Sequence, residues 1–295
     1  MENKVCRVAL IGRPNVGKST LLNNILKYNL SIVTNVAQTT RDLIKGIYTD
    51  KNYQIIFYDT PGIHKGFNLL SERLNQKSYA AISEVDVILF LSEATGEIGK
   101  GDHFIIDKIK EINPEAKLIG ILTKIDLVND KNELDRKASD LKALGTETVL
   151  GVGLNLNLAY SDVIEELKKY ANEEDFEYSE DEFTDVSQRF LAKEYIRLCA
   201  IEKLFQELPH SIAVEIDEFS EKEGKPYTIF ATLYVKKQSQ KGILIGKNAS
   251  TIKEISINAR KLMESAFQHG VYLKVNVKVS PDWVDDEKKI KEMGY

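Results

Sequence analysis

A nine-residue stretch near the N-terminus, GRPNVGKST at residues 12–20, leaves few folds open to this chain. It fits the pattern Gly-x-x-x-x-Gly-Lys-Ser/Thr, in which backbone N–H groups close around phosphate oxygens. The β-branched run VCRVALIG at residues 5–12 precedes the loop and a predicted helix follows it, which is the context that the pattern requires. The glycines let the backbone come close to phosphate, and the helix N-terminus favours an anion. The predicted nucleotide-binding residues of this loop are Gly12, Arg13, Pro14, Asn15, Val16, Gly17, Lys18, Ser19 and Thr20.

Two side chains of this loop and one segment behind it have distinct predicted roles. Lys18 can reach the β- and γ-phosphates of a nucleotide, and the Ser19 hydroxyl can ligate Mg²⁺. The tetrapeptide DTPG at residues 59–62 ends an apolar, strand-like run. Asp59 can contact Mg²⁺, often through water, and the N–H of Gly62 can approach the γ-phosphate because no side chain intervenes. The sequence therefore predicts a combined phosphate and magnesium site.

The polar stretch TTRD at residues 39–42 lies between these two phosphate-binding segments. A threonine there can bring its hydroxyl to Mg²⁺ and its backbone to the γ-phosphate; Thr40 is the predicted residue and Thr39 the alternative. We expect this loop, and the segment that contains Ile63, to be switches that the γ-phosphate orders and that hydrolysis releases.

The motif TKID at residues 123–126 follows the apolar run LIGIL. Asp126 can accept hydrogen bonds from both N1–H and N2–H of guanine, a pair that adenine does not offer. Lys124 would cover the base plane with its aliphatic stem, and Thr123 opens the motif. This segment predicts selection of a guanine nucleotide.

Apolar runs alternate with helical patterns through the first part of the chain. This alternation predicts an α/β domain over residues 1–171, with a mixed, mostly parallel sheet between helices on both faces. Strand-like runs lie at 5–12, 43–50, 53–60, 85–91 and 116–123, and helical patterns at 69–83, 101–112, 132–144 and 159–170.

A different pattern follows the acidic stretch at residues 172–186, which we interpret as a linker. Residues 187–295 predict a second, α+β domain, with helices near 187–208, 239–245, 250–270 and 283–293 and strands within 211–237 and 271–281.

Composition narrows the class of protein further. The 295 residues carry a net charge of −5, so an anionic partner would need a local basic patch. The two cysteines, Cys6 and Cys199, have no metal-ligand spacing, which favours a reducing compartment. The N-terminus has no apolar signal-peptide core, and no apolar run reaches the roughly 20 residues of a membrane-spanning helix. We therefore expect a cytoplasmic protein, and a monomer.

The phrases GRPNVGKSTLLN, AQTTRD and YDTPGIHKG, with RFLAKEYIR, SQKGILIGK, VYLKVNVKV and EMGY in the second half, resemble the Era family of bacterial GTPases. The resemblance covers essentially the whole chain. It implies hydrolysis of GTP to GDP and phosphate with Mg²⁺, and a KH domain that binds the 3′ end of small-subunit ribosomal RNA during maturation of the small ribosomal subunit. It also implies weak peripheral association with the inner face of the membrane.

Two segments depart from what this resemblance implies, and a third position differs from Ras-like enzymes. Thr123 replaces the usual asparagine, and its hydroxyl can supply part of the amide's bonding. The expected Ser-Ala loop near residues 150–154 reads LGVGL, so a backbone N–H of Val152 or Gly153 would meet guanine O6. Ile63 stands where Ras-like enzymes have a water-positioning glutamine. We therefore expect slow intrinsic hydrolysis, stimulated by a partner or a monovalent cation, with Asn15 matching the residue that some relatives use to hold K⁺.

KH domains grip single-stranded RNA through a Gly-x-x-Gly turn between two helices. The corresponding turn here is Gly246, Lys247, Asn248 and Ala249, with Lys241, Ile243, Leu244 and Ile245 as flanking predicted RNA-binding residues. The three apolar residues of this set form a groove against RNA bases, or some of them pack in the core instead. Residues 224–253 contain six lysines and no acidic residue, a basic stripe in an acidic chain. We expect Ala249 to begin the next helix, where alanine carries no backbone penalty.

Two alternatives stay open from the sequence: a phosphate-loop ATPase or kinase with a substrate-binding second domain, and an RNA-binding assembly protein whose nucleotide site is inert.

Overall fold

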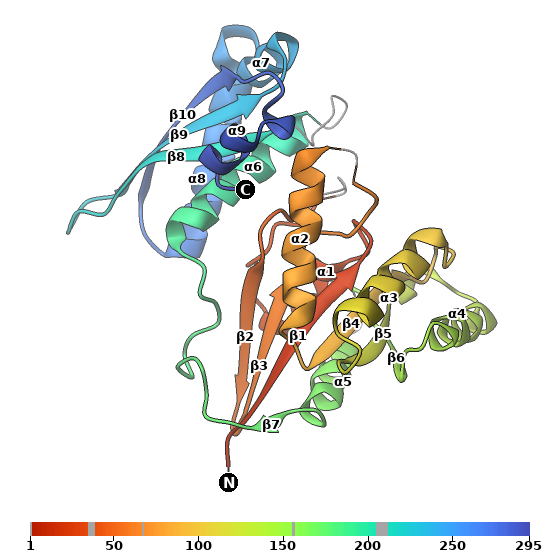
Figure 1. Ribbon diagram of the computed structural model, residues 1–295. Helices are drawn as coiled ribbons and strands as arrows, with labels where there is room; N and C mark the ends of the chain where they lie inside the picture. The colour runs from red at the N-terminus through yellow and green to blue at the C-terminus, as the bar shows by residue number, and fades with distance from the viewer. Residues whose placement is uncertain (1, 35–38, 67, 155–156, 205–211) are drawn as a thin grey trace. The chain divides into compact units, whose positions relative to one another are not determined.

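The computed structural model of the chain describes residues 2–34, 39–66, 68–154, 157–204 and 212–295 (Figure 1). The chain divides into two compact units. Unit 1 comprises Met1–Ser31, Thr40–Phe67 and Ser71–Asp185, and unit 2 comprises Ile32–Thr39, Asn68–Leu70 and Val186–Tyr295.

Unit 1 is built on a twisted sheet with the strand order β2-β3-β1-β4-β5-β6, while β7 pairs with β1. All neighbouring strands are parallel except β2 with β3 and β7 with β1. The strands are β1 (Lys4–Gly12), β2 (Ile44–Asp50), β3 (Tyr53–Asp59), β4 (Val87–Glu93), β5 (Lys117–Thr123), β6 (Thr148–Gly151) and β7 (Asn172–Glu173). The mixed, mostly parallel sheet that the sequence predicts is therefore present.

Helices cover the sheet of unit 1, as Figure 1 shows. They are α1 (Lys18–Leu26), α2 (Leu69–Ser83), α3 (Lys100–Ile112), α4 (Lys131–Ala143) and α5 (Asn157–Lys168). Apolar residues of α2, α3 and α4 share one core cluster with β1 and β4, while α1 packs against α5 and β2. The central strands are buried on both faces, which explains why they are continuous apolar runs in the sequence.

The acidic segment that we interpreted as a linker has defined contacts within unit 1. Its first residues form β7 beside β1, and Gln54 of β3 accepts hydrogen bonds from the backbone N–H groups of Glu177 (2.9 Å) and Tyr178 (3.1 Å). Arg7 pairs with Glu174 and Glu177. Hydrogen bonds to a buried side chain and ion pairs hold this stretch, together with Phe176 and Tyr178, which pack against the apolar core.

Unit 2 has a three-stranded sheet in the order β10-β9-β8, with β9 and β10 parallel and β8 and β9 antiparallel. Its elements are α6 (Gln188–Lys203), β8 (Ala213–Ser220), β9 (Tyr227–Val235), α7 (Gln238–Ile245), α8 (Ser250–Phe267), β10 (Val271–Val279) and α9 (Glu287–Glu292). Helix α6 packs against α8 and β8. The expected end of the first helix at residue 208 lies outside the described residues, and the single predicted helix at 283–293 is a short 3₁₀ turn, Trp283–Asp285, followed by α9.

Within the described part of the chain, no helix is both long and apolar enough to cross a bilayer.

Candidate functional site

The phosphate loop joins the end of β1 to the start of α1. Gly17 has φ of +99°, in the left-handed region that favours glycine, and Asn15 shares that region at +63°. A Cβ on Gly12 would lie 2.6 Å from the carbonyl O of Leu91, so the loop passes too close to β4 for any side chain there. These positions give the loop the tight path that the sequence pattern predicts.

Lys18 is buried, and its ammonium faces the carbonyls of its own loop. Its Nζ donates to the carbonyl O of Gly12 (3.3 Å) and of Arg13 (3.0 Å). Burial lowers the pKa of Lys18 to about 8, although the nearby charge of Asp59 acts in the opposite direction. The Lys18 ammonium is therefore poorly neutralised in the nucleotide-free loop, and a bound anion would compensate its charge.

The three predicted magnesium ligands lie together. Ser19 Oγ is 2.9 Å from Thr40 Oγ1 and donates to Asp59 Oδ2 at 2.7 Å. Burial raises the pKa of Asp59, which the Ser19 hydrogen bond and the Lys18 charge oppose. Hydroxyl and carboxylate oxygens are the hard donors that Mg²⁺ prefers, so the residues fit this ion.

The alternative residue, Thr39, has different surroundings. Its hydroxyl lies 2.6 Å from Thr34 Oγ1, and its carbonyl accepts a hydrogen bond from Arg197 Nη2 at 2.5 Å, within unit 2. The geometry therefore places Thr40, rather than Thr39, beside Ser19.

The DTPG segment lies directly against the phosphate loop. A Cβ on Gly62 would be 2.6 Å from Cα and N of Pro14, so only glycine allows this approach. Ile63 donates its N–H to the carbonyl O of Gly12 at 3.2 Å, and its side chain is fully buried in the apolar core. The side chain of Ile63 thus faces the core and cannot orient an attacking water.

The guanine motif begins at the carboxyl end of β5, next to the loop. Thr123 Oγ1 donates to the carbonyl O of Val16 at 2.7 Å, so its hydroxyl connects the two segments. Lys124 Nζ donates to the carbonyl O of Asn15 (3.3 Å) and to Glu93 Oε1 (2.5 Å). Glu93 was not among the predicted site residues, although a polar residue that ends an apolar parallel strand at the ligand-binding edge of a sheet is a usable signal.

Asp126 lies against the LGVGL segment. Its Oδ1 is buried and has no hydrogen-bond partner among the described residues, which suits an acceptor awaiting a donor. A Cβ on Gly153 would lie 2.4 Å from this oxygen. The N–H of Val152 already donates to the carbonyl O of Leu122 at 2.8 Å, which leaves Gly153 as the better candidate for guanine O6.

The side chain of Arg13 turns away from the phosphate loop. Its Nε lies 3.1 Å from Oδ1 of the fully buried Asp102, in the first turn of α3, and its Nη2 donates to the carbonyl O of Glu97. Any contact of Arg13 with a nucleotide therefore falls to its backbone. Thr20 lies in the first turn of α1, where its carbonyl accepts from Asn24.

The second glycine turn connects α7 to α8 in unit 2. Gly246 has φ of +71°, and a Cβ there would lie 2.3 Å from Thr251 Oγ1. Lys247 and Asn248 are exposed. Our expectation for Ala249 was wrong: it has φ of +59°, and Asn248 has +53°, so both are left-handed and helix α8 starts one residue later. The turn thus imposes on Ala249 a conformation that glycine adopts more easily.

The apolar residues beside this turn have two different environments. Leu244 is fully buried, so its predicted contact with RNA bases is wrong; α7 packs against α8, β9 and β10 and turns this face inward. Ile243 is 38% exposed and stays available to a ligand. Lys241 and Ile245 are half-buried.

Two family models match the chain: one for a 50S ribosome-binding GTPase over residues 7–124 and one for a KH domain over residues 207–284. GTPase Era of Mycoplasmopsis agalactiae is 48% identical over 292 residues, which cover 99% of each chain. GTPase Era of Clostridium tetani is 40% identical over 293 residues, covering 98% of this chain and 97% of the relative. The chain belongs to the Era family of GTPases.

Solved Era structures have the same fold over nearly all of the chain. A crystal structure of Era in complex with MgGDPNP and nucleotides 1506–1542 of 16S ribosomal RNA matches with a TM-score of 0.92 and 32% identity, covering 99% of both chains. A variant of Aquifex aeolicus Era bound to GDP and aluminium fluoride matches equally well. The family model described as a 50S ribosome-binding GTPase covers only residues 7–124. Its description therefore does not apply to the KH domain, which a separate model matches at residues 207–284.

Proposed function

We propose that this chain binds GTP with Mg²⁺, hydrolyses it slowly to GDP and phosphate, and binds small-subunit ribosomal RNA near its 3′ end during assembly of that subunit. The observation that carries the proposal is the match over 99% of the chain to an Era molecule that holds both MgGDPNP and 16S ribosomal RNA. The phosphate loop and the KH turn of this chain supply residues suited to both ligands.

The phosphate end of the site is a preformed set of charges and donors. Lys18 exchanges its two carbonyl partners for phosphate oxygens, and the N–H of Gly62 meets the γ-phosphate. Ser19, Thr40 and Asp59 would hold Mg²⁺, which supplies positive charge to the phosphate oxygens when bound.

The base end of the site selects guanine through fixed acceptors and donors. Asp126 accepts N1–H and N2–H, the N–H of Gly153 meets O6, and the stem of Lys124 covers the ring. Thr123, through Val16, ties this edge to the phosphate loop and so takes over a structural part of the usual asparagine's role.

The hydrolytic water has no side-chain partner at position 63, and this supports slow intrinsic turnover. We propose that a partner, or K⁺ held near Asn15, raises the rate. Turnover measured in matched K⁺ and Na⁺ buffers tests the ion: equal rates would remove K⁺ from the mechanism.

RNA binding centres on Gly246, Lys247, Asn248 and Ala249. The left-handed turn exposes backbone toward phosphates, Lys247 adds charge, and Ile243 offers an apolar contact to bases. Lys241 extends the basic stripe.

The experiment that tests this function is crosslinking with RNA sequencing, with a GTP analogue and with GDP. We expect wild type to crosslink to the 3′ end of small-subunit RNA, and Lys247→Glu to lose most of this signal. Lys288→Glu, an exposed lysine of α9 outside the turn, is the charge-matched control. Equal crosslinking by Lys247→Glu and wild type would contradict the assignment of this turn to RNA binding.

Three further properties stay predictions: a monomeric state, a cytoplasmic location, and the weak peripheral association with the inner face of the membrane that the family resemblance implies. Sedimentation of the purified protein tests the first, and fractionation of cells at low and high salt tests the other two.

A further inference from the structure

The segment at residues 150–154 has no polar side chain with which to fix its own position. It is nevertheless held on two sides. Ile125 donates its N–H to the carbonyl O of Val152 at 3.3 Å, and a Cβ on Gly151 would lie 2.9 Å from Ile125 Cδ1. These contacts fix residues 151 and 152, but neither reaches the carbonyl of Gly153.

A tyrosine of α5 makes that third connection. Tyr160 Oη donates to the carbonyl O of Gly153 at 3.2 Å, in a buried position, and the ring itself is only 8% exposed. Burial raises the pKa of Tyr160 and the charge of Asp126 adds to this, which agrees with a phenol close to the base-reading carboxylate.

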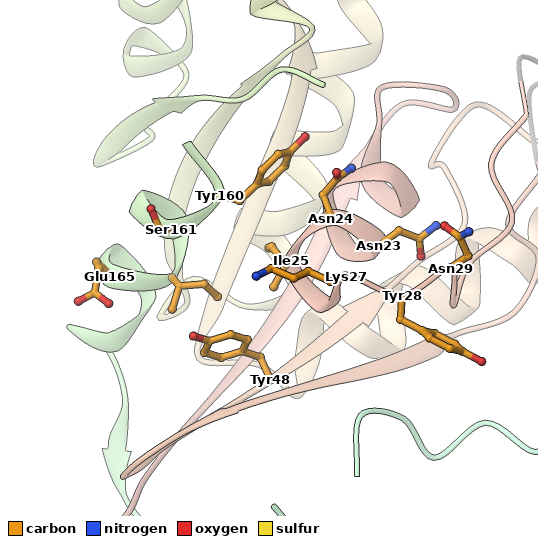
Figure 2. Close-up of a pocket in the computed structure, with 11 residues that line it drawn as sticks. Asn23, Asn24, Ile25, Lys27, Tyr28, Asn29, Tyr48, Tyr160, Ser161 and Glu165 are labelled. Carbon is orange, nitrogen blue, oxygen red and sulfur yellow. The ribbon is translucent and has the colours of Figure 1, made fainter. Parts of the chain in front are cut away.

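Tyr160 also lines a cavity. This cavity has a volume of about 700 Å³ and lies between α1, β2 and α5. Figure 2 shows Tyr160 at one end of it and Tyr48 at the other, with the Tyr160 hydroxyl directed away from Tyr48. The hydrogen bond to Gly153 therefore anchors the end of the ring that lies away from Tyr48.

We propose that Tyr160 is a positioning residue for guanine recognition: its hydroxyl fixes Gly153, and Gly153 in turn sets both the backbone N–H that meets O6 and the position of the Asp126 carboxylate. The inference rests on the proposed guanine site. No side chain of the 150–154 segment can supply the same hydrogen bond.

The test compares GDP with ADP, because adenine has neither O6 nor N1–H. Tyr160→Phe removes one hydrogen bond, so we expect GDP affinity to fall about threefold to tenfold and ADP affinity to stay unchanged. Turnover at saturating GTP should also stay unchanged. Tyr48→Phe is the matched control, because it deletes a hydroxyl from the same cavity without touching the base-binding segment.

Two outcomes would overturn the proposal. One is an unchanged GDP-to-ADP preference in Tyr160→Phe. The other is an equal loss for both nucleotides together with a lower melting temperature, which indicates a merely structural role.

Asp126→Asn separates this result from failure of the guanine site itself. The asparagine amide can donate to the 2-oxo group of xanthine, so this variant should lose GDP and gain xanthosine diphosphate. If Asp126→Asn keeps its guanine preference, the proposed base site is wrong. If it switches while Tyr160→Phe does not change, only the role of Tyr160 is wrong.

Discussion

Lys18 is a buried cation whose hydrogen-bond partners are two backbone carbonyls. Because burial lowers its pKa to about 8, from 10.5 for the free side chain, the folded, nucleotide-free protein releases this proton more readily than the unfolded chain. The unfolded chain therefore binds more protons between these two pKa values, and the contribution of Lys18 to stability rises with pH across that window.

Nucleotide binding should depend on the same proton. Bound phosphate needs the ammonium form, so binding above pH 8 requires proton uptake, and GDP affinity should fall by up to about tenfold per pH unit there. Titrations between pH 7 and the onset of guanine ionisation measure this. Lys18→Arg stays charged throughout, and its affinity should be flat over that range. A wild-type affinity that is equally flat would contradict the shifted pKa.

Ala249 carries strain at a single backbone position. An alanine in the left-handed region costs roughly 1–2 kcal/mol of folding free energy. Glycine removes this cost, but it raises the entropy of the unfolded chain, which offsets roughly 0.4–1 kcal/mol of the gain. Ala249→Gly should therefore stabilise unit 2 by up to about 1.5 kcal/mol in denaturant unfolding, with little change in RNA affinity because the turn is already formed. Ala266→Gly, in the last turn of helix α8, relieves no such strain and should not stabilise unit 2. Loss of stability in both variants would contradict the strain.

Local pattern predicted some of these residues and missed others for a physical reason. The Thr123 hydroxyl was predicted to replace part of an amide's bonding, and it does bond Val16, because both motifs lie at one sheet edge. Ala249 was misjudged because the following Ser-Thr is typical of a helix start, whereas the turn angles are set by how α7 meets α8. Tyr160 gives no local signal: its partner depends on where α5 crosses β6.

At the scale of elements, the acidic segment shows how side chains can fix a stretch that lacks a hydrophobic pattern. The composition of this segment predicts disorder. Composition takes no account of a hydrogen-bond acceptor that lies 123 residues away in the sequence and is buried in the fold. The fully buried Gln54 is that acceptor. The alternating strands and helices of unit 1, by contrast, were predictable, because each satisfies its own backbone and buries an apolar face.

Gln54→Leu should release the segment. Two backbone N–H groups, those of Glu177 and Tyr178, would lose their acceptor, at about 1–3 kcal/mol for each group that stays buried. Hydrogen exchange of residues 174–180 should accelerate, and the unfolding free energy should fall. Thr49→Val removes only the 3.3 Å hydrogen bond from Gln54 to Thr49 and should leave exchange in the segment unchanged. Normal protection in Gln54→Leu would show that the ion pairs and the packing of Phe176 and Tyr178 suffice.

At the scale of the molecule, two consecutive residues belong to different units. Thr40 lies beside Ser19 in unit 1, and Thr39 is bonded to the buried Arg197 in unit 2. Arg197 also pairs with Glu194. A nucleotide that changes the position of Thr40 in unit 1 therefore acts directly beside Thr39, which is hydrogen-bonded within unit 2.

We predict that Arg197→Lys weakens communication between nucleotide and RNA. Lysine can keep the charge pair with Glu194 but lacks the forked donor that also reaches Thr39. The ratio of RNA affinities with GTP analogue and with GDP should move toward one, and by linkage the effect of RNA on nucleotide affinity should shrink equally. Lys203→Met, which removes a surface pair with Glu254, is the control. An unchanged ratio in Arg197→Lys would rule out this connection.

The cavity behind Tyr160 has a consequence for inhibition. Its volume lies within the range of ligand-binding pockets, and no residue of the phosphate loop lines it. A small molecule that filled it and displaced the phenol would weaken guanine binding without competing for the nucleotide site. Because such coupling is reciprocal, bound GTP would weaken this molecule by the same factor, and the molecule would raise the GTP concentration needed for half-maximal turnover without lowering turnover at saturation.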